Sequence, residues 1–409
     1  MGGLLFDNII PVQVTSVLNI RGMLVGIFRA VKLLFLIKGV IGGDFRYTSG
    51  LMGEMHGLPQ KLGQHLTLYR ADQSELEQYF KGLCTAGRAE DVPVGDILRE
   101  IGLSPGNIKM AAQASIGQVY RVAAKDGVLA VKVKYPGVEK KIKSDFSVLK
   151  GLLWPIRFLP LKNSSLLPTL QNVKLMLLRE CDYQIEAENQ RRFYRLFSED
   201  DEISVPEVIT YNNRAIVSRW IEGQNLTQHP VPLDRWFIQT YFKFILKSLS
   251  GLGMVHADPH PGNFIITGDR NEKKELAVLD FGSVVVFDTE EVAAVCRLLS
   301  GSYEKEADLI DDLQVLGVSG ETLDIYGAIA GDLVSILLEP LYYPGDYDFK
   351  TWRLQYKMNT LLASKGWEKP LDIPLKLLLL LRTLQGLYFY ARRDSIIFSW
   401  HDALKKYLG

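Results

Sequence analysis

The residues from 253 to 263, GMVHADPHPGN, place several polar side chains in a stretch that proline and glycine keep out of a helix. Asp258 and Asn263 are five positions apart, and a short apolar run separates them from Asp280 in the tetrapeptide LDFG. Phosphoryl transfer from a nucleoside triphosphate needs a carboxylate beside the attacking oxygen and oxygen ligands for magnesium on the phosphates. Asp258 fits the first task, and Asn263 and Asp280 fit the second. The spacing therefore predicts a magnesium-dependent phosphoryl-transfer site.

A positive side chain for the phosphates is available upstream, in the sequence AVKV around Lys132. Valines on both sides are typical of a half-buried strand, which would cover the stem of the lysine and leave its ammonium group accessible. Lys134 is the alternative candidate, because side chains alternate along a strand and both lysines share one face. A lone strand lysine usually faces solvent, but the acidic residues downstream favour the phosphate role for Lys132.

The helical pattern from about 172 to 197 carries acidic residues that could pair with this lysine. They are Glu180, Asp182, Glu186 and Glu188. Asp182 and Glu186 are four positions apart and share a helix face. Arg191 and Arg192 offer solvent-exposed partners for some of these carboxylates, so we expect only one or two to face the site.

Three segments of different character must position these residues. Residues 1–108 show helical periodicity with glycine and proline turn signals, and residues 109–222 contain short β-branched runs, including a hairpin around 125–127. From 223 to 409 the pattern is helical again, apart from the short apolar runs FII and LAVLDF. The sequence therefore predicts an α+β fold with a helical extension, a strand-rich lobe and a helical lobe.

The composition is that of an ordinary globular protein, with 47% hydrophobic and 23% charged residues. Lysine plus arginine and aspartate plus glutamate both number 47, so the net charge is zero and provides no general attraction to nucleic acid. The cysteines, Cys84, Cys181 and Cys296, form no paired motif, which argues against a disulfide framework or a thiolate metal site. These features predict an intracellular protein that does not bind nucleic acid.

Two apolar stretches are long enough to raise the question of membrane insertion. Val17–Ile41 contains four basic residues, and the stretch from 373 to 393 is interrupted by Lys376 and Arg382. Neither has a run of about 18 uncharged residues, so we predict no transmembrane helix. Val17–Ile41 would carry a basic stripe on an apolar helix, which fits either the membrane interface or a buried position, and the second stretch predicts a core helix. The start, MGGLLFDNII, lacks the basic region of a signal peptide, so we expect a cytoplasmic or peripheral membrane protein.

Taken in order, these motifs resemble those of the UbiB-like, AarF-related atypical kinases. The resemblance runs from about residue 50 to the end of the chain and adds residues that spacing alone did not assign. Its features are the KxGQ motif at Lys61 and Gln64, the alanine-rich loop Ala112, Gln113, Ala114 and Ser115, Lys132 in AVKV, the ExD motif at Glu180 and Asp182 followed by Glu186, the segment from His256 to Asn263, and Asp280. Six motifs in the same order are hard to obtain by chance.

The resemblance implies a protein-kinase-like bilobal fold in which the N-terminal extension packs over the active site. ATP and Mg²⁺ are the implied cofactors, with Asp258 as the catalytic aspartate and Asn263 and Asp280 as the metal ligands. Lys132, paired with Glu186, would bind the phosphates.

The same resemblance assigns roles outside this centre. The alanine-rich loop would contact the nucleotide, and Lys61 and Gln64 would lie near Glu180. The implied activity is that of an atypical kinase or ATPase in isoprenoid-quinone (ubiquinone-type) or related lipid metabolism at a membrane surface. Components of that lipid pathway are the implied partners.

Two departures from the family pattern bear on these expectations. Gln113 stands where the family has an alanine, which affects the expected nucleotide preference. The chain reaches Gly409 without the paired C-terminal transmembrane helices of the bacterial members, so membrane contact is expected to be peripheral.

Two other functions fit part of the pattern. An ATP-binding pseudokinase that regulates a lipid-biosynthesis complex would suit a loop stiffened by alanine. A small-molecule phosphotransferase would share the segment from 256 to 263 and the metal motif, but would lack KxGQ and ExD. In each case we expect His256 and His260 to support the loop rather than transfer protons.

Overall fold

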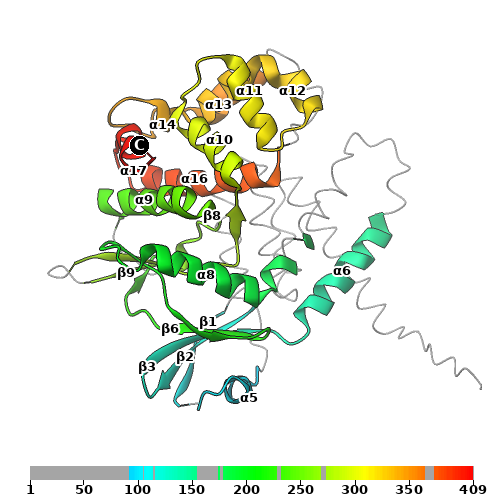
Figure 1. Ribbon diagram of the computed structural model, residues 1–409, viewed down its shortest axis with the longest axis vertical. Helices are drawn as coiled ribbons and strands as arrows, with labels where there is room; N and C mark the ends of the chain where they lie inside the picture. Colours follow the sequence, from blue (N-terminus) through cyan, green and yellow to red (C-terminus); the bar gives the residue numbers. More distant parts are fainter. Residues whose placement is uncertain are drawn as a thin grey trace, which may run out of the picture.

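The computed structural model describes residues 92–104, 106–113, 116–153, 174–175, 178–227, 232–268, 273–363 and 373–408. The expected N-terminal extension up to residue 91, with Val17–Ile41, Lys61 and Gln64, lies outside the described residues, as do Ala114 and Ser115. Within them the fold is α+β, with a strand-rich lobe followed by a helical lobe, as the sequence predicts (Figure 1). The boundaries expected at residues 108 and 222 stay predictions.

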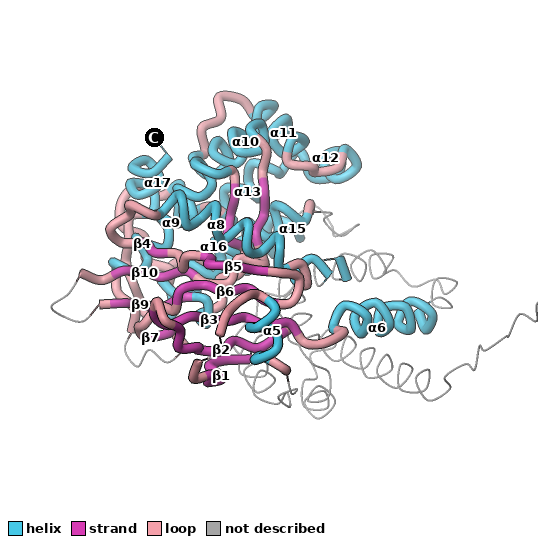
Figure 2. Tube along the Cα trace, turned by 60° about the horizontal axis from the view of Figure 1, so that its bottom comes forward, coloured by secondary structure: helices cyan, strands magenta, loops and turns pink. Residues whose placement is uncertain are grey.

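The strand-rich lobe is built on a five-stranded antiparallel sheet with the order β1-β2-β3-β6-β5. Its strands are β1 Ile108–Gln113, β2 Gly117–Ala124, β3 Gly127–Lys134, β6 Ala215–Arg219 and β5 Val208–Tyr211. Figure 2 shows them side by side, with β1 at one edge. Val131, Val133 and Val217 are fully buried on one face, in the same hydrophobic cluster as the short helix α5 (Val94–Glu100). Because side chains alternate, Lys132 points from the opposite face.

Strand β1 differs from the prediction of an alanine-rich loop that begins at Ala112. Ala112 pairs with Val119 and Gln113 pairs with Gln118 of β2, so the first half of the expected alanine-rich loop is strand. Alanine has little strand preference, and the register shifts between Met110 and Ala112, which left no alternating pattern to recognise.

Two helices accompany the sheet, α6 (Val138–Leu153) and α8 (Tyr183–Phe197). Helix α8 begins at Asp182, whose carboxylate accepts hydrogen bonds from the backbone N–H groups of Gln184 and Ile185. It buries Glu186 and Phe193 on one face. This face meets strands β5 and β6 and helix α9 (Arg235–Leu252), so α8 contacts both lobes.

The helical lobe is centred on α9, most of which is buried. Short strands follow it: β8 Met254–His256, β9 Phe264–Thr267, β10 Glu275–Val278 and β11 Val284–Val286, with β4 Ile203–Ser204 and β7 Gln224–Asn225 pairing to β10 and β9. The later helices are α10 Thr289–Ser300, α11 Glu306–Val315, α12 Gly320–Tyr326, α13 Ala330–Leu337, α14 Glu339–Tyr342, α15 Leu354–Ala363, α16 Leu375–Arg393 and α17 Trp400–Leu408. The stretch predicted as a core helix is α16, which buries nine of its residues. No helix in the described part of the chain has the length and apolar character that crossing a membrane requires.

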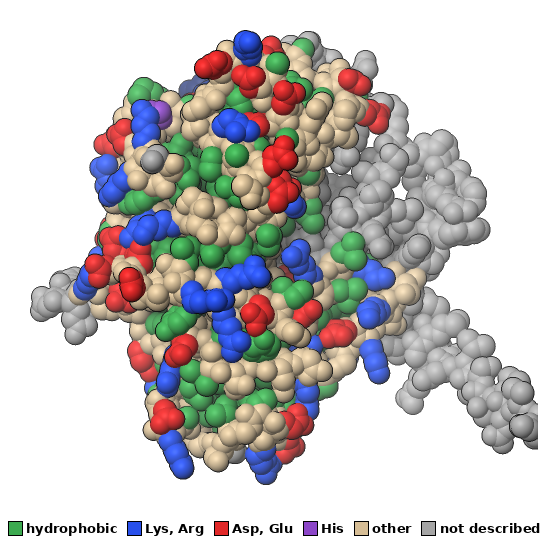
Figure 3. All heavy atoms as spheres, viewed as in Figure 1, with side chains coloured by type: hydrophobic (Ala, Val, Ile, Leu, Met, Phe, Trp, Pro, Cys, Tyr) green, Lys and Arg blue, Asp and Glu red, His purple; other side chains and the backbone are tan. Residues whose placement is uncertain are grey.

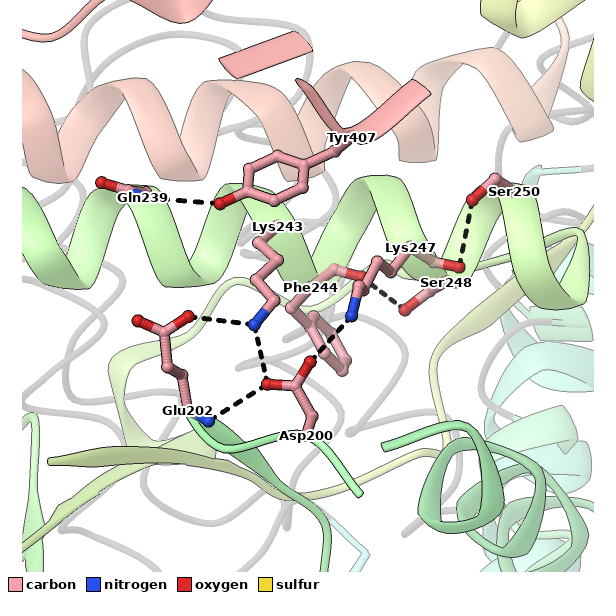
Figure 4. A network of polar contacts seen from close by, with 9 residues as sticks. All are labelled: Asp200, Glu202, Gln239, Lys243, Phe244, Lys247, Ser248, Ser250 and Tyr407. Atoms are coloured by element: carbon pink, nitrogen blue, oxygen red, sulfur yellow. Dashed lines mark hydrogen bonds and ion pairs between the residues drawn. The ribbon is translucent and has the colours of Figure 1, made fainter. Parts of the chain in front are cut away.

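A buried ionic network joins the segment after α8 to α9 (Figure 4). Asp200, with a side chain 4% exposed, binds Lys243 Nζ at 2.8 Å and Lys247 Nζ at 2.9 Å. Lys243 also binds Glu202 at 2.9 Å. Burial opposes the charge of Asp200, but the two lysines outweigh it and lower its pKa. The network therefore fixes the entry to β4 against the helical lobe.

Candidate functional site

A cavity of about 650 Å³ lies between the two lobes. Its polar lining includes Lys132, Glu186, Asp258, Asn263 and Asp280. Its apolar lining includes Val119, Ala130, Ile216, Ile265 and Leu279. Residues from both lobes thus form one site, and apolar walls with a few convergent charged groups are typical of a cofactor pocket.

Lys132 lies at the centre of the polar lining. Its Nζ is 2.6 Å from Glu186 Oε1 on α8 and 3.2 Å from Asp280 Oδ2 in the helical lobe. Burial disfavours the charge of Lys132, but Asp280 and Glu186 outweigh it, and the lysine pKa is raised well above its ordinary value. The sequence predicted that Glu186 faces this lysine, and the geometry agrees.

Lys134, the alternative candidate, is engaged elsewhere. Its Nζ binds Glu139 Oε1 at 2.7 Å and the backbone oxygen of Cys181 at 2.8 Å. Both lysines lie over the ring of Tyr183, with each Nζ 5.5 Å from the ring centroid. Tyr183 thus separates the two charges, and only Lys132 faces Asp280.

The other acidic residues of the 180–188 segment do not share the position of Glu186. Glu188 pairs with Arg191 at 3.4 Å and accepts a hydrogen bond from the hydroxyl of Tyr211. Figure 3 shows a cluster of basic side chains over α8, at the centre of the face of the molecule that it draws. The expectation that arginines answer part of the acidic helix is therefore confirmed for Glu188.

The ExD motif is placed at the start of α8, beside the site rather than in it. Asp182 is the helix cap described above, and Glu180 is 9% exposed. Neither is among the described residues that line the cavity. Their expected contacts with Lys61 and Gln64 fall outside the described residues and stay predictions.

Asp258 is held by both of its carboxylate oxygens. Asn263 Nδ2 donates to Oδ2 at 3.0 Å and to the backbone oxygen of Asp258 at 3.2 Å. Arg382 Nη2 on α16 donates to Oδ1 at 3.1 Å, and the Asp258 and Arg382 side chains are 8% and 11% exposed. A buried carboxylate needs such partners to keep its charge.

Arg382 was not predicted as a site residue. It lies 124 positions after Asp258, and the sequence analysis treated it only as a charge that interrupts an apolar stretch. One signal was available: an arginine in a buried apolar helix needs a carboxylate partner. The sequence did not indicate which carboxylate that is.

The loop from His256 to Asn263 is supported mainly through its backbone. His256 Nε2 lies 2.8 Å from the backbone oxygen of Asp280 and 3.1 Å from that of Leu279, joining the two acidic segments. His260 Nδ1 accepts from the N–H of Gly262 at 3.0 Å. These contacts agree with the expected supporting role of both histidines.

Helix α16 holds the same loop from the other side. Thr383 Oγ1 donates to the backbone oxygen of His256 at 3.2 Å, and the Tyr390 hydroxyl donates to that of Pro259 at 2.7 Å. At Gly386 a Cβ atom would lie 2.3 Å from Pro259 Cβ, so only glycine permits this approach.

Asp280 adopts a left-handed backbone conformation with φ of 59°, which is uncommon for a residue with a side chain. Its Oδ1 accepts from the N–H of Gly282 at 3.2 Å, while Oδ2 faces Lys132. The carboxylate remains 35% exposed. Backbone strain of this kind concentrates where a side chain must point in one direction, here into the cavity.

The oxygen atoms of this site suit magnesium held jointly with phosphates. Because Asn263 Nδ2 is used for Asp258, its Oδ1 is the atom available to a metal ion, and Asp280 offers a carboxylate. In the described part of the chain no group of three or more His, Cys, Asp or Glu side chains could hold a metal by itself. Magnesium commonly binds through one or two protein oxygens plus substrate phosphates, so the donor set fits it.

Comparison with known proteins adds to this geometry. The family model described as ABC1 atypical kinase-like domain matches residues 102–313. The chain belongs to the ABC1 atypical kinase-like family. Its relatives include the protein ACTIVITY OF BC1 COMPLEX KINASE 3, chloroplastic, of Arabidopsis thaliana, which is 29% identical over 68% of this chain and 40% of its own length. The mitochondrial atypical kinase COQ8 of Schizosaccharomyces pombe is 31% identical over 59% of this chain and 40% of its own length.

The matched part of this chain covers only 40% of the length of each of these two relatives. A solved structure also supports the fold. Rv3197 from Mycobacterium tuberculosis, solved as a complex with erythromycin, matches with a TM-score of 0.55 and 20% identity. The match covers 95% of this chain and 97% of that one. The protein-kinase-like bilobal fold expected from the sequence is confirmed.

Proposed function

We propose that this ABC1-family chain is an ATP-dependent atypical kinase or ATPase that uses Mg²⁺. One observation carries the proposal: Lys132 Nζ of the strand-rich lobe lies 3.2 Å from Asp280 Oδ2 of the helical lobe, within the cavity. A cation and a carboxylate at this separation, with Asn263 nearby, match what the phosphates and metal of MgATP require.

Each residue then has a distinct task. Lys132, held by Glu186, binds the phosphates, and Asn263 and Asp280 hold Mg²⁺. When bound, the metal ion neutralises charge that develops on the phosphates. Asp258 orients the attacking hydroxyl or water and accepts its proton, while Arg382 and Asn263 fix the direction of that carboxylate. Ala112 lies in the cavity lining, and with Gln113, Ala114 and Ser115 it is proposed to contact the nucleotide.

The metabolic role follows from the resemblance to UbiB-like kinases. We infer that the protein acts in isoprenoid-quinone or related lipid metabolism, with pathway components as partners and peripheral contact with a membrane surface. Two of its relatives are named as a chloroplastic and a mitochondrial kinase, which supports a role for this chain among the UbiB-like kinases.

A nucleotide-binding pseudokinase is the second candidate, and the engagement of Asp258 favours it. Both oxygens of that carboxylate already accept hydrogen bonds, so fewer of its lone pairs remain for an incoming proton. The family match and the bilobal fold make a small-molecule phosphotransferase the weaker alternative.

One experiment separates these functions. ATP hydrolysis is measured with Mg²⁺, with and without anionic liposomes, for the wild type and for Asp258→Asn. An enzyme at a membrane surface shows turnover that depends on Asp258 and rises with liposomes. Nucleotide binding with equal background hydrolysis in both proteins would instead establish the pseudokinase.

A further inference from the structure

The helical lobe contains a second cavity, of about 110 Å³. Among the described residues, it shares no lining residue with the cavity between the lobes (the cleft). Helices α10, α11, α12, α13 and α16 surround the second cavity. Among the described residues that line it, all are aliphatic except Thr322 and Tyr326. The hydroxyl of Thr322 already shares a hydrogen bond with that of Ser319, at 2.9 Å. The described lining of the cavity therefore offers dispersion contacts and no charge.

The cavity lies where two hydrophobic clusters meet. Leu313 and Leu377 belong to the main cluster of the helical lobe, whereas Tyr326 and Leu333 belong to a separate small cluster with Leu362 of α15. Protein interiors are close-packed, and side chains around a void lose contacts on one side. An apolar group that entered this space would restore those contacts.

The lining and the size together restrict what can bind. An ion or a nucleotide would lose its hydration without any charged partner here. A peptide would bury backbone N–H and C=O groups against aliphatic side chains. The volume is of the same order as the ~150 Å³ apolar cavity that takes up benzene in another protein. A small hydrocarbon group remains as the ligand class that fits.

We propose that this cavity binds a hydrocarbon group, such as the end of an alkyl or alkenyl chain, and that its occupancy holds α16 against the catalytic loop. The second part follows from the position of α16. Leu380, Leu381 and Leu384 line the cavity, and between them Arg382 and Thr383 bind Asp258 and the backbone of His256. A ligand that packs on the leucines therefore supports the helix turn that holds Asp258.

Thermal unfolding of the full chain tests binding. The probes are benzene, as a free hydrocarbon, and 1-octanol, as a chain with a polar head. Ala330→Leu fills the cavity, and Ala328→Leu is the matched control, because Ala330 lines the cavity and Ala328 is exposed. We expect at least one probe to raise the melting temperature of the wild type and of Ala328→Leu by about 1 °C, the shift that ~1 kcal/mol gives in a chain of 409 residues. A shift with 1-octanol identifies a lipid-like chain as the source, and a shift with benzene alone identifies a free hydrocarbon.

Two results would overturn the binding site: no shift with either probe in the wild type, or an equal shift in Ala330→Leu. If Ala330→Leu does not fold, saturation transfer from protein methyl protons to benzene, measured by NMR on the wild type, decides the question, and no transfer refutes the site.

Hydrogen exchange tests the link to the catalytic loop. Binding of the active probe should slow amide exchange of residues 257–263 by about twofold or more in the wild type, with no change in Ala330→Leu. A thermal shift with unchanged exchange in this loop would refute the coupling. Neither measurement needs ATP, so both are independent of the proposed function.

Discussion

The two walls of the cleft hold their charged groups by different means. Lys132 is on a strand and is held by two carboxylates, one from α8 and one from the helical lobe. Asp258 is on a loop that α16 and His256 fix through backbone oxygens, in addition to the side-chain contacts from Asn263 and Arg382. Charge pairs hold the first wall, whereas the second wall adds packing and backbone contacts to its charge pair between Asp258 and Arg382. A substitution of Lys132 should therefore affect mainly nucleotide binding. A substitution of Asp258 should affect mainly turnover.

Asp258→Asn should have the largest effect. The amide keeps the size of the side chain but cannot accept a proton, so turnover should fall by roughly 10²- to 10⁴-fold, the range for a general acid or base. Nucleotide affinity should stay close to that of the wild type, because Asp258 does not bind phosphate in the proposed scheme. Steady-state ATP hydrolysis and calorimetric binding of ADP with Mg²⁺ measure the two quantities. Turnover within a factor of two of the wild type would exclude the assignment.

Lys132→Met should weaken nucleotide binding by about 10- to 100-fold, the value of a hydrogen bond to a charged group. It also leaves Glu186 buried and unpaired, so the free energy of unfolding should fall. Lys134→Met is the matched control, because it removes an equivalent charge from the same strand face. We expect that control to change affinity by less than about twofold, since Lys134 is not among the described residues that line the cavity. Its loss should also cost little stability, because its partner Glu139 is half exposed. Equal losses in both variants would show that the two lysines are not distinguished.

Arg382→Met should lower turnover roughly tenfold while nucleotide affinity is retained, because misplacing a reacting group by about 1 Å can cost as much as 10²-fold. Arg382→Lys restores the charge but not the planar donor geometry, so partial recovery is expected. Separate measurements of kcat and of KM for ATP distinguish this role from a general loss of stability. A parallel fall in affinity and turnover would mean that Arg382 only maintains the fold.

Gly386→Ala should have the smallest effect on chemistry and a clear effect on stability. The added methyl group would lie 2.3 Å from Pro259 Cβ, so α16 and the loop must move apart. Overpacking of this kind usually costs about 1–3 kcal/mol in the free energy of unfolding. Chemical denaturation measures it, with Gly331→Ala as control, since its nearest neighbour is 3.9 Å away. Unchanged stability would show that α16 is not in contact with the loop.

These differences also explain which parts of the site could be predicted from sequence. Asp258, Asn263 and Asp280 are close in sequence, with a short strand between them, so their spacing carries the geometry. Lys132 and Glu186 each sit in a regular element whose period fixes the direction of the side chain. Their partnership with the aspartates could be expected because each residue type has a specific chemical task.

Other features had no local pattern. Arg382 reaches Asp258 only through the packing of α16, which no spacing along the chain encodes. Strand β1 is an edge strand that contains two alanines and a shift of register, and its state is decided by pairing with β2. Asp182 reads as a possible site carboxylate, yet its described contacts are those of a helix cap. Tertiary contacts thus decided the outcome for Arg382 and β1, whereas a local helix cap engages Asp182.

The position of α16 sets a lower limit on how far the protein can be shortened. The family match ends at residue 313, but Arg382, Thr383 and Tyr390 reach back from beyond it to the catalytic loop. A fragment trimmed to the matched region would keep every residue proposed to be catalytic. It would also strip the support from Asp258 and expose the aromatic face of α9, where Phe237 packs on Tyr390. The smallest autonomous unit is therefore defined by a helix that carries no motif at all.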